Sequence, residues 1–164
     1  MRKRAGAFLC GLAACAAAGN LAAGVGLPLV RDGAGGKNHA LRAADALGTS
    51  VLLAERLKSL VREKRPDSNS CDSFPSGHAT AAFAVTMVEC QWHPKEAPLW
   101  YLGATLISYS RVSLDRHYTR DVIAGAALGY ATARVELGQR RGLILHPFIM
   151  PYDGGYGLQI TKGL

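Results

Sequence analysis

Small side chains dominate this sequence, and they limit the folds that it can adopt. Its 164 residues include 26 alanines and 19 glycines, whereas aromatic residues make up only 7%. Side chains of this size let helices pack closely, while the strands of a β-sandwich favour β-branched and aromatic residues. With 49% hydrophobic and 19% charged residues, the composition also differs from that of disordered proteins. We therefore expect an all-α fold in a single domain.

Four segments place apolar residues at helical spacing: residues 39–64, 76–92, 97–110 and 117–137. Pro66 ends the first helix, because the residue before a proline is pushed out of the α region. Pro94 ends the second, and Gly138 suits the position that follows the fourth. The glycines within residues 31–37 predict a turn or loop before the first helix. The sequence thus predicts a compact helical bundle with a core over residues 39–138.

The C-terminal residues 139–164 have a different pattern. Tyr156, Leu158 and Ile160 alternate with other residues, and Asp153 is followed by two glycines that suit a turn. We expect a C-terminal strap over the bundle, made of extended structure or a short β-hairpin.

The first residues have the layout of an export signal. A basic segment, Met1 to Arg4, precedes an apolar run from Ala5 to Ala18 that ends in small residues. We expect residues 1–23 to be a signal peptide, a lipoprotein signal or an anchor, and residues 24–164 to form the domain. The protein is therefore predicted to be exported to the periplasm.

Three routes for this N-terminal segment remain open. Leu12-Ala13-Ala14-Cys15 is similar to a lipobox, and a lipidated Cys15 would attach the protein to a membrane. The alanines at 16–18 suit ordinary cleavage instead. The uncharged run from Ala5 to Val30 is long enough for an uncleaved helix across ~30 Å of hydrocarbon. Beyond residue 30 no uncharged apolar run reaches about 18 residues, so the domain itself is not expected to cross a bilayer.

The formal charge of +7 indicates an anionic partner without identifying it. An oxidising compartment would permit a disulfide between Cys71 and Cys90. Cys90, however, should lie near the far end of the helix over residues 76–92, ~20 Å from its start at ~1.5 Å per residue. Cys71 precedes that start, so two free thiols are the favoured interpretation.

Three short segments carry residues suited to chemistry. The first runs from Lys58 to Arg65 and Pro66. Seven residues make almost two helical turns, so Lys58 and Arg65 are expected on one helical face. Lys58 shares the apolar stripe of Val51 and Ala54, and a lysine that faces the interior needs an anion nearby. The alternative is a solvated basic patch, because Arg56, Arg62 and Lys64 lie close in sequence.

The second segment is Ser73-Phe74-Pro75-Ser76-Gly77-His78, directly before the apolar run of a helix. A helix N-terminus offers unpaired N–H groups and the positive end of the helix dipole. Gly77 would let an anion approach the backbone, and His78 in the first turn would face it. The alternative is an ordinary capped helix, since serine and proline are common at this position.

The third segment runs from Ser110-Arg111 to His117 and Asp121. His117 and Asp121 are four residues apart, which predicts neighbours on one helical face. A carboxylate bonded to one ring nitrogen would fix the tautomer and leave the other nitrogen as an oriented nucleophile or base. The alternative is a surface pair without a catalytic role.

Together these segments resemble the signature of the type 2 phosphatidic acid phosphatase/vanadium haloperoxidase superfamily. That signature reads Lys, six residues, Arg-Pro; then Pro-Ser-Gly-His; then Ser-Arg, five residues, His, three residues, Asp, which is the pattern found here. Every position is filled in order between Lys58 and Asp121. The resemblance implies a helical bundle of the acid phosphatase/haloperoxidase type, in the exported bacterial phosphatase branch.

The resemblance also implies a role for each matched residue. His117 would attack phosphorus to form a phosphohistidine, while Asp121 orients its ring. His78 would protonate the leaving oxygen and later activate water. The positively charged groups would replace a metal ion, so no metal and no other cofactor is expected. The phosphate oxygens would be held by Lys58, Arg65, Ser76, Gly77 and Arg111.

Two other functions fit the same residues. One is a vanadate-dependent haloperoxidase, in which the anion-binding residues would hold vanadate, and the other is a catalytically silent exported protein. As a phosphatase, the protein would act on phosphomonoesters or on lipid phosphates or pyrophosphates. No nucleic-acid partner is expected, and the N-terminus offers a means of membrane-surface association. His39, His93 and His146 belong to no grouping typical of metal ligands and are expected to be ordinary histidines.

Overall fold

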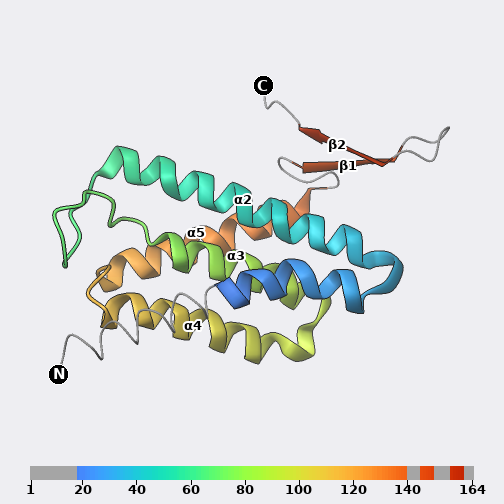
Figure 1. Ribbon diagram of the computed structural model, residues 1–164, viewed down its shortest axis with the longest axis horizontal. Coiled ribbons are helices and arrows are strands. Elements are labelled where there is room, and N and C mark those ends of the chain that lie inside the picture. Colours follow the sequence, from blue (N-terminus) through green and yellow to red (C-terminus); the bar gives the residue numbers. More distant parts are fainter. Residues whose placement is uncertain (1–17, 140–144, 150–155, 161–164) are drawn as a thin grey trace.

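The computed structural model describes residues 18–139 and the backbone of residues 145–149 and 156–160. Figure 1 shows a bundle of roughly antiparallel helices, which confirms the expected all-α fold. A helix over residues 18–31 comes first, and the short 3-10 turn η1 (Gly33–Gly35) joins it to the next helix. A second turn, η2 (Pro94–Glu96), lies between the third and fourth helices of the chain. The labelled helices are α2 (Gly36–Val61), α3 (Gly77–Trp92), α4 (Ala97–Ser113) and α5 (Thr119–Gly138).

Helix α3 is the axis of the bundle, because it packs against α2, α4 and α5. Its buried residues occur on every side of the helix, a pattern typical of a fully enclosed helix. Small side chains fill most of the space between the helices, which explains the alanine content of the sequence. The main core cluster consists of Ala43, Ala46, Ala84, Met87, Val88 and Ala133.

Two glycines let α5 approach the backbone of α3. A Cβ atom at Gly129 would lie 2.1 Å from the carbonyl oxygen of Thr80, and one at Gly125 would lie 2.5 Å from that of Ser76. Both distances are far below van der Waals contact, so any side chain there would push the helices apart. The N-termini of α3 and α5 are consequently held close together.

The first predicted helix ends earlier than the sequence indicated. Helix α2 stops at Val61, because Arg62 adopts a left-handed conformation with φ 51° and ψ 41°. Arg65 therefore lies in the loop before α3, where its N–H donates to the carbonyl of Ser70 at 3.0 Å. The prediction that Lys58 and Arg65 share one helical face is wrong, because the helix ends between them.

The fourth predicted helix begins later than expected, at Thr119. Tyr118 is extended, with φ −74° and ψ 156°, and its N–H donates to Oδ2 of Asp121 at 3.0 Å. His117 therefore precedes the helix. The prediction that His117 and Asp121 share a helical face is wrong, although they remain close in space.

The helix over residues 18–31 packs on the bundle. A Cβ atom at Gly24 would lie 1.9 Å from Cγ1 of Val85, so the helix backbone touches α3. This helix continues across residue 23, the predicted end of the export segment, whereas residues 1–17, with Cys15, lie outside the described residues. Among the described helices, none is both long and apolar enough to span a bilayer.

Asp32 joins the end of that helix to the bundle. Its Oδ2 accepts hydrogen bonds from Nδ1 of His39 at 2.6 Å and from Nε2 of His93 at 3.2 Å. The hydrogen bond from His39 lowers the pKa of Asp32, with burial acting in the opposite direction. The His39 ring also stacks on Trp92, with ring centroids 4.0 Å apart. His39 and His93 therefore stabilise the fold through these contacts. The side chain of His146 lies outside the described residues.

The tail contains two antiparallel strands, β1 (Leu145–Ile149) and β2 (Tyr156–Ile160), in which Pro147 pairs with Leu158. This agrees with the alternation in the sequence, and β1 lies beside α2 (Figure 1). The predicted turn at Asp153 lies outside the described residues. Cys71 is exposed and Cys90 half-buried, and both are free thiols, as expected.

The close contact between α3 and α5 predicts a large effect of Gly129→Ala. The added methyl group would meet the Thr80 carbonyl, and overpacking of this kind costs about 1–3 kcal/mol of unfolding free energy. The matched control is Gly48→Ala in α2, where nothing lies within 4 Å of the new atom. That change should stabilise the protein by up to about 1 kcal/mol, through helix propensity. Urea unfolding measures both, and equal stability of the two variants would contradict the packing described here.

Candidate active site

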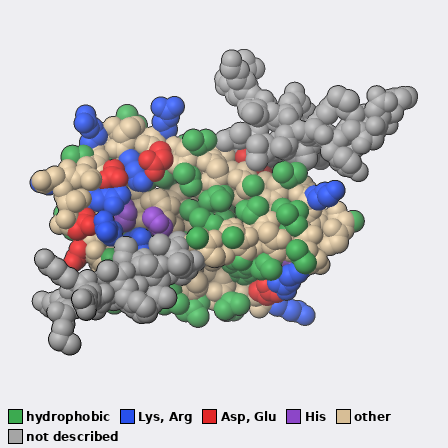
Figure 2. Space-filling view, in the orientation of Figure 1, with side chains coloured by type: hydrophobic (Ala, Val, Ile, Leu, Met, Phe, Trp, Pro, Cys, Tyr) green, Lys and Arg blue, Asp and Glu red, His purple; other side chains and the backbone are tan. Residues whose placement is uncertain are grey.

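The sequence-predicted site residues meet at one end of the bundle. The C-termini of α2 and α4 lie there beside the N-termini of α3 and α5 (Figure 1). Figure 2 shows histidine side chains at this end, with lysine and arginine side chains around them and hydrophobic side chains beside them. Segments that are far apart in the sequence thus contribute to one polar surface.

The two helix N-termini are joined by direct hydrogen bonds. The N–H of Ser76 donates to the carbonyl of Asp121 at 2.9 Å. The hydroxyl of Ser73 donates to Oδ2 of the same residue at 2.5 Å. Asp121 is fully buried, so these contacts hold the loop before α3 against the first turn of α5. We call this contact between the N-termini of α3 and α5 the joint. It positions His78, in the first turn of α3, and His117, just before α5.

His117 is oriented by a backbone carbonyl. Its Nδ1 lies 2.8 Å from the carbonyl oxygen of Ser73, and the residue is only 4% exposed. A carbonyl oxygen can only accept, so Nδ1 carries the proton and Nε2 of the neutral ring keeps its lone pair. Burial lowers the pKa of His117, and the hydrogen bond to Ser73 opposes that shift. The ring is therefore held in the neutral tautomer that a nucleophile at Nε2 requires.

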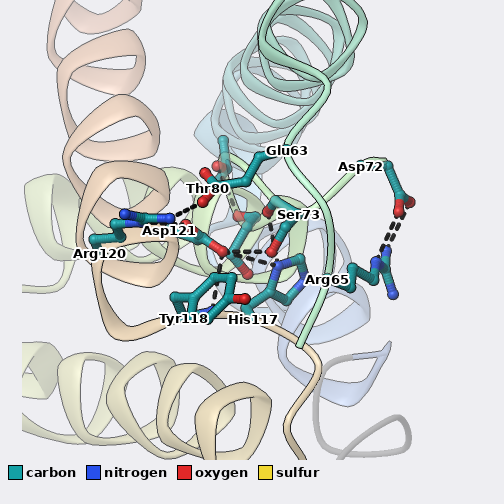
Figure 3. A network of polar contacts seen from close by, with 10 residues as sticks. Glu63, Arg65, Asp72, Ser73, Thr80, His117, Tyr118, Arg120 and Asp121 are labelled. Carbon is teal, nitrogen blue, oxygen red and sulfur yellow. Dashed lines mark hydrogen bonds and ion pairs between the residues drawn. The ribbon is translucent and has the colours of Figure 1, made fainter. Parts of the chain in front are cut away.

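Asp121 does not bond to the ring itself, which corrects the sequence prediction. Its Oδ2 lies 3.9 Å from Nδ1 of His117, too far for a hydrogen bond. Instead this oxygen accepts from the Ser73 hydroxyl and from the N–H of Tyr118 (Figure 3). On its other side, Nε of Arg120 lies 3.7 Å from Oδ1, and Arg120 also pairs with the carboxylate of Glu63.

His78 lies among positive charges. Burial by the surrounding protein is the largest of the causes that lower the pKa of His78 to about 4. The remaining causes are electrostatic effects of four nearby residues, Arg111, His117, Lys58 and Arg65. Arg111, Lys58 and Arg65 thus lie near enough to His78 to affect its protonation.

Two of the predicted phosphate-binding cations hold carboxylates. Nζ of Lys58 donates to Glu55 at 2.6 Å, and it lies 3.2 Å from the position that a Cβ of Gly77 would take. Arg65 binds both oxygens of Asp72 through Nε and Nη2, each at 2.8 Å. A bound oxyanion would therefore either displace these carboxylates from Lys58 and Arg65 or bind to the same cations beside them.

The other predicted binding groups are buried at the same end. Arg111 is 5% exposed, and its Nε donates to the hydroxyl of Ser110 at 3.1 Å. The hydroxyl of Ser76 is buried and has no hydrogen-bond partner among the described residues. A buried hydroxyl without a partner is costly, so Ser76 is suited to receive a ligand oxygen.

A cavity of about 250 Å³ opens beside Lys58 and His78. Its charged end is formed by these two residues with Glu55 and Gly77, and the rest of its wall is apolar. The apolar lining residues are Leu21, Val51, Ala81 and Ala82. Sequence reasoning missed this wall, and Leu21 lies within the predicted export segment.

The described residues bring together no group of three or more histidine, cysteine, aspartate or glutamate side chains suited to a metal ion. The positively charged side chains at the candidate site are those of Lys58, Arg65 and Arg111. The chemistry that this arrangement supports is binding of an oxyanion between two imidazoles.

Comparison with known families gives an independent assignment of the same segments. A family model described as the PAP2 superfamily matches residues 40–143. Lipid A 1-phosphatase from Porphyromonas gingivalis is 30% identical over 126 residues, which are 73% of this chain and 27% of that protein. Phosphatidylglycerophosphatase B from Bacillus subtilis is 35% identical over 98 residues, 50% of this chain and 48% of the relative. The chain thus spans less than half the length of either relative.

A solved structure is also similar. It is the crystal structure of a transmembrane PAP2 type phosphatidylglycerolphosphate phosphatase from Bacillus subtilis. The match has a TM-score of 0.51 and 27% sequence identity, and it covers 80% of this chain and 68% of that one.

The charges around His78 predict how its proton responds to a ligand. In an NMR titration of the ligand-free protein, His78 should lose its proton near the pKa of about 4 that burial and the nearby cations produce. Inorganic phosphate should raise this pKa, because its negative charge opposes the cations and favours the protonated ring. His39 lies at the other end of the bundle and serves as an internal control, because added phosphate at constant pH should leave its chemical shifts unchanged. A His78 pKa near 6.5 that ignores phosphate would contradict the site.

Proposed function

The chain belongs to the PAP2 superfamily, and from this premise we propose that it is a phosphoric ester hydrolase that works through a phosphohistidine. His117 is the proposed nucleophile and His78 the proposed general acid and base. The observation that carries the proposal is the hydrogen bond from Nδ1 of His117 to the Ser73 carbonyl, because it leaves Nε2 ready to attack. No metal ion takes part in the proposed reaction.

Phosphate binding is assigned to the groups around His78. Lys58, Arg65 and Arg111 would contact the phosphoryl oxygens, together with the hydroxyl of Ser76 and the N–H of Gly77. Phosphoryl transfer spreads negative charge over three equatorial oxygens, and fixed cations stabilise that distribution. The positive end of the α3 dipole adds to this field.

The proposed reaction has two steps. In the first, Nε2 of His117 forms a bond to phosphorus as the bond to the leaving oxygen breaks, and His78 gives its proton to that oxygen. In the second, His78 removes a proton from water, the water oxygen attacks phosphorus, and the bond to His117 breaks. Phosphate is released, and both histidines return to their starting protonation states.

His78 must be protonated for the first step, although its pKa in the empty site is about 4. The phosphate of the substrate resolves this conflict, because its negative charge favours the imidazolium form. The proton on His78 is thus acquired together with the substrate. This coupling favours activity at acidic pH, where substrate and imidazolium coexist most readily.

An amphiphilic phosphate ester is the proposed substrate class. The cavity places apolar side chains directly beside Lys58 and His78, so a phosphate bound there would carry its apolar group against Val51 and Leu21. The names of the relatives, lipid A 1-phosphatase and phosphatidylglycerophosphatase B, support a lipid phosphate over a small sugar phosphate. A lipid pyrophosphate fits the same charges.

Export to the periplasm and attachment to a membrane remain part of the proposal. The similar solved structure is that of a transmembrane phosphatase, which supports the proposal that this protein acts at a membrane surface. A lipidated Cys15 or an uncleaved N-terminal segment would provide the attachment.

The proposed mechanism predicts that the intermediate can be trapped. With an aryl phosphate, whose leaving group needs little protonation, His78→Asn should still form the phosphohistidine but hydrolyse it slowly. The acid-labile, base-stable phosphoprotein should therefore accumulate in His78→Asn and be absent from His117→Ala. Mass spectrometry after alkaline quenching measures both.

Metal removal is the accompanying control. Wild-type turnover should persist in EDTA, and loss of activity that zinc or magnesium restores would overturn the metal-free mechanism. Equal phosphorylation of the His117→Ala and His78→Asn variants would overturn the assignment of the nucleophile.

The cavity predicts a substrate-selective effect of Val51→Gln. Replacing apolar surface in the cavity wall should lower kcat/KM for a lipid phosphate in micelles by about 10-fold, since burial of one apolar side chain contributes about 1.5–3 kcal/mol. Turnover of a water-soluble aryl phosphate should change less than about 2-fold. The matched control is Leu52→Gln, because Leu52 is 58% exposed on the same helix and outside the cavity. Equal losses with both substrates would contradict the proposed apolar subsite.

A further inference from the structure

Ser73 lies in the candidate site but outside the signature positions, and all of its polar groups form hydrogen bonds. It is completely buried although it lies in the loop between α2 and α3. Its N–H donates to the carbonyl of Glu63 at 2.9 Å, its hydroxyl donates to Asp121 at 2.5 Å, and its carbonyl accepts from His117 at 2.8 Å. All three polar groups of one serine are thus used, each toward a different residue.

Figure 3 shows Ser73 between Asp121 and His117. The carboxylate of Asp121 and the ring of His117 do not bond to each other, since their nearest polar atoms are 3.9 Å apart. Both instead bond to Ser73, on its hydroxyl and on its carbonyl. The carboxylate can therefore influence the ring only through the serine or through the weaker electrostatic attraction across that gap.

The Ser73 hydroxyl also fixes the direction of the Ser73 carbonyl. Hydrogen bonds at the N–H and at the side chain leave the residue little freedom to rotate, so the carbonyl stays pointed at Nδ1. Asp121 is held in turn by the N–H of Tyr118 at the start of α5. The position of the His117 ring is thereby tied to the N-terminus of α5.

We propose that Ser73 is a positioning residue that links Asp121 to the nucleophile His117. The inference rests on the proposed function, because it names how that nucleophile is oriented. Ser73 touches neither substrate nor phosphorus. Its hydroxyl anchors the loop to the Asp121 carboxylate, and its carbonyl holds the proton of His117 on Nδ1.

The first test is Ser73→Ala, which removes the hydroxyl and keeps the carbonyl. A loosened carbonyl should let the ring leave its productive orientation, and misplacement of a reacting group by ~1 Å costs up to about 100-fold in rate. We expect kcat to fall about 10- to 100-fold, with KM changed less than about 3-fold, because the phosphate-binding groups are untouched. Ser73→Thr, which keeps a hydroxyl, should recover part of the rate. The control is Ser50→Ala, another fully buried serine, whose hydroxyl bonds within α2.

A second readout separates positioning from stability and needs no substrate. The hydrogen bond to Ser73 raises the pKa of His117, so weakening it should lower that pKa further. NMR of 15N-labelled histidine should show the Nδ1–H tautomer in the wild type and a mixture of tautomers in Ser73→Ala. Ser50→Ala should change neither, even if it lowers the melting temperature.

A double-mutant cycle separates the two routes from Asp121 to the ring. If Asp121 acts through Ser73, Ser73→Ala combined with Asp121→Asn should lose no more rate than the worse single variant. If the rate losses of the two single variants multiply in the double variant, the link is overturned and the carboxylate acts directly on the ring. The link is also overturned if Ser73→Ala leaves kcat, the pKa of His117 and its tautomer unchanged. The two proposals can also fail separately. If the wild-type protein is inactive but shows the Nδ1–H tautomer, and Ser73→Ala disturbs that tautomer, the proposed function is refuted while the link between Asp121 and His117 stands.

Discussion

The candidate site depends on the joint between the N-termini of α3 and α5. Ser76 N–H and the Ser73 hydroxyl both bond to Asp121, and Gly125 lets the two backbones approach at the same level. Because His78 begins α3 and His117 precedes α5, this joint fixes the separation of the two imidazoles. The packing of α5 against α3, which Gly125 permits, therefore also sets the distance between the two histidines.

The electrostatic character of the site follows from the same arrangement. Burial and the nearby lysine and arginine side chains lower the pKa of His78 and of His117, so both rings favour the neutral form. In the proposed reaction an oxyanion would reverse that balance, so that His78 would gain its proton when the substrate binds. The carboxylates of Glu55 and Asp72 partly neutralise Lys58 and Arg65 until an anion arrives. A cluster of cations can therefore exist in the folded protein before any ligand is bound.

Much of this organisation was predictable from the sequence, for physical reasons that apply to particular residues. The helical fold followed from apolar periodicity and small side chains, and the family motifs identified the residues that meet at the site. The end of α2 was missed because Arg62 takes a left-handed conformation that its residue type does not indicate. The bond from His117 to Ser73 was missed because it uses a backbone carbonyl, and spacing arguments consider only side chains. The contribution of Leu21 depends on how a helix packs, which a local pattern cannot show.

A structure of the protein with bound orthovanadate would test the central claim most directly. Vanadate adopts the five-coordinate geometry of phosphoryl transfer, so it reports where the reacting phosphorus would lie. The account predicts vanadium bonded to Nε2 of His117, with His78 beside the opposite apical oxygen and Lys58, Arg65 and Arg111 on the equatorial oxygens. Vanadate bound elsewhere, or held by the cations with His117 turned away and His78 out of reach, would contradict it.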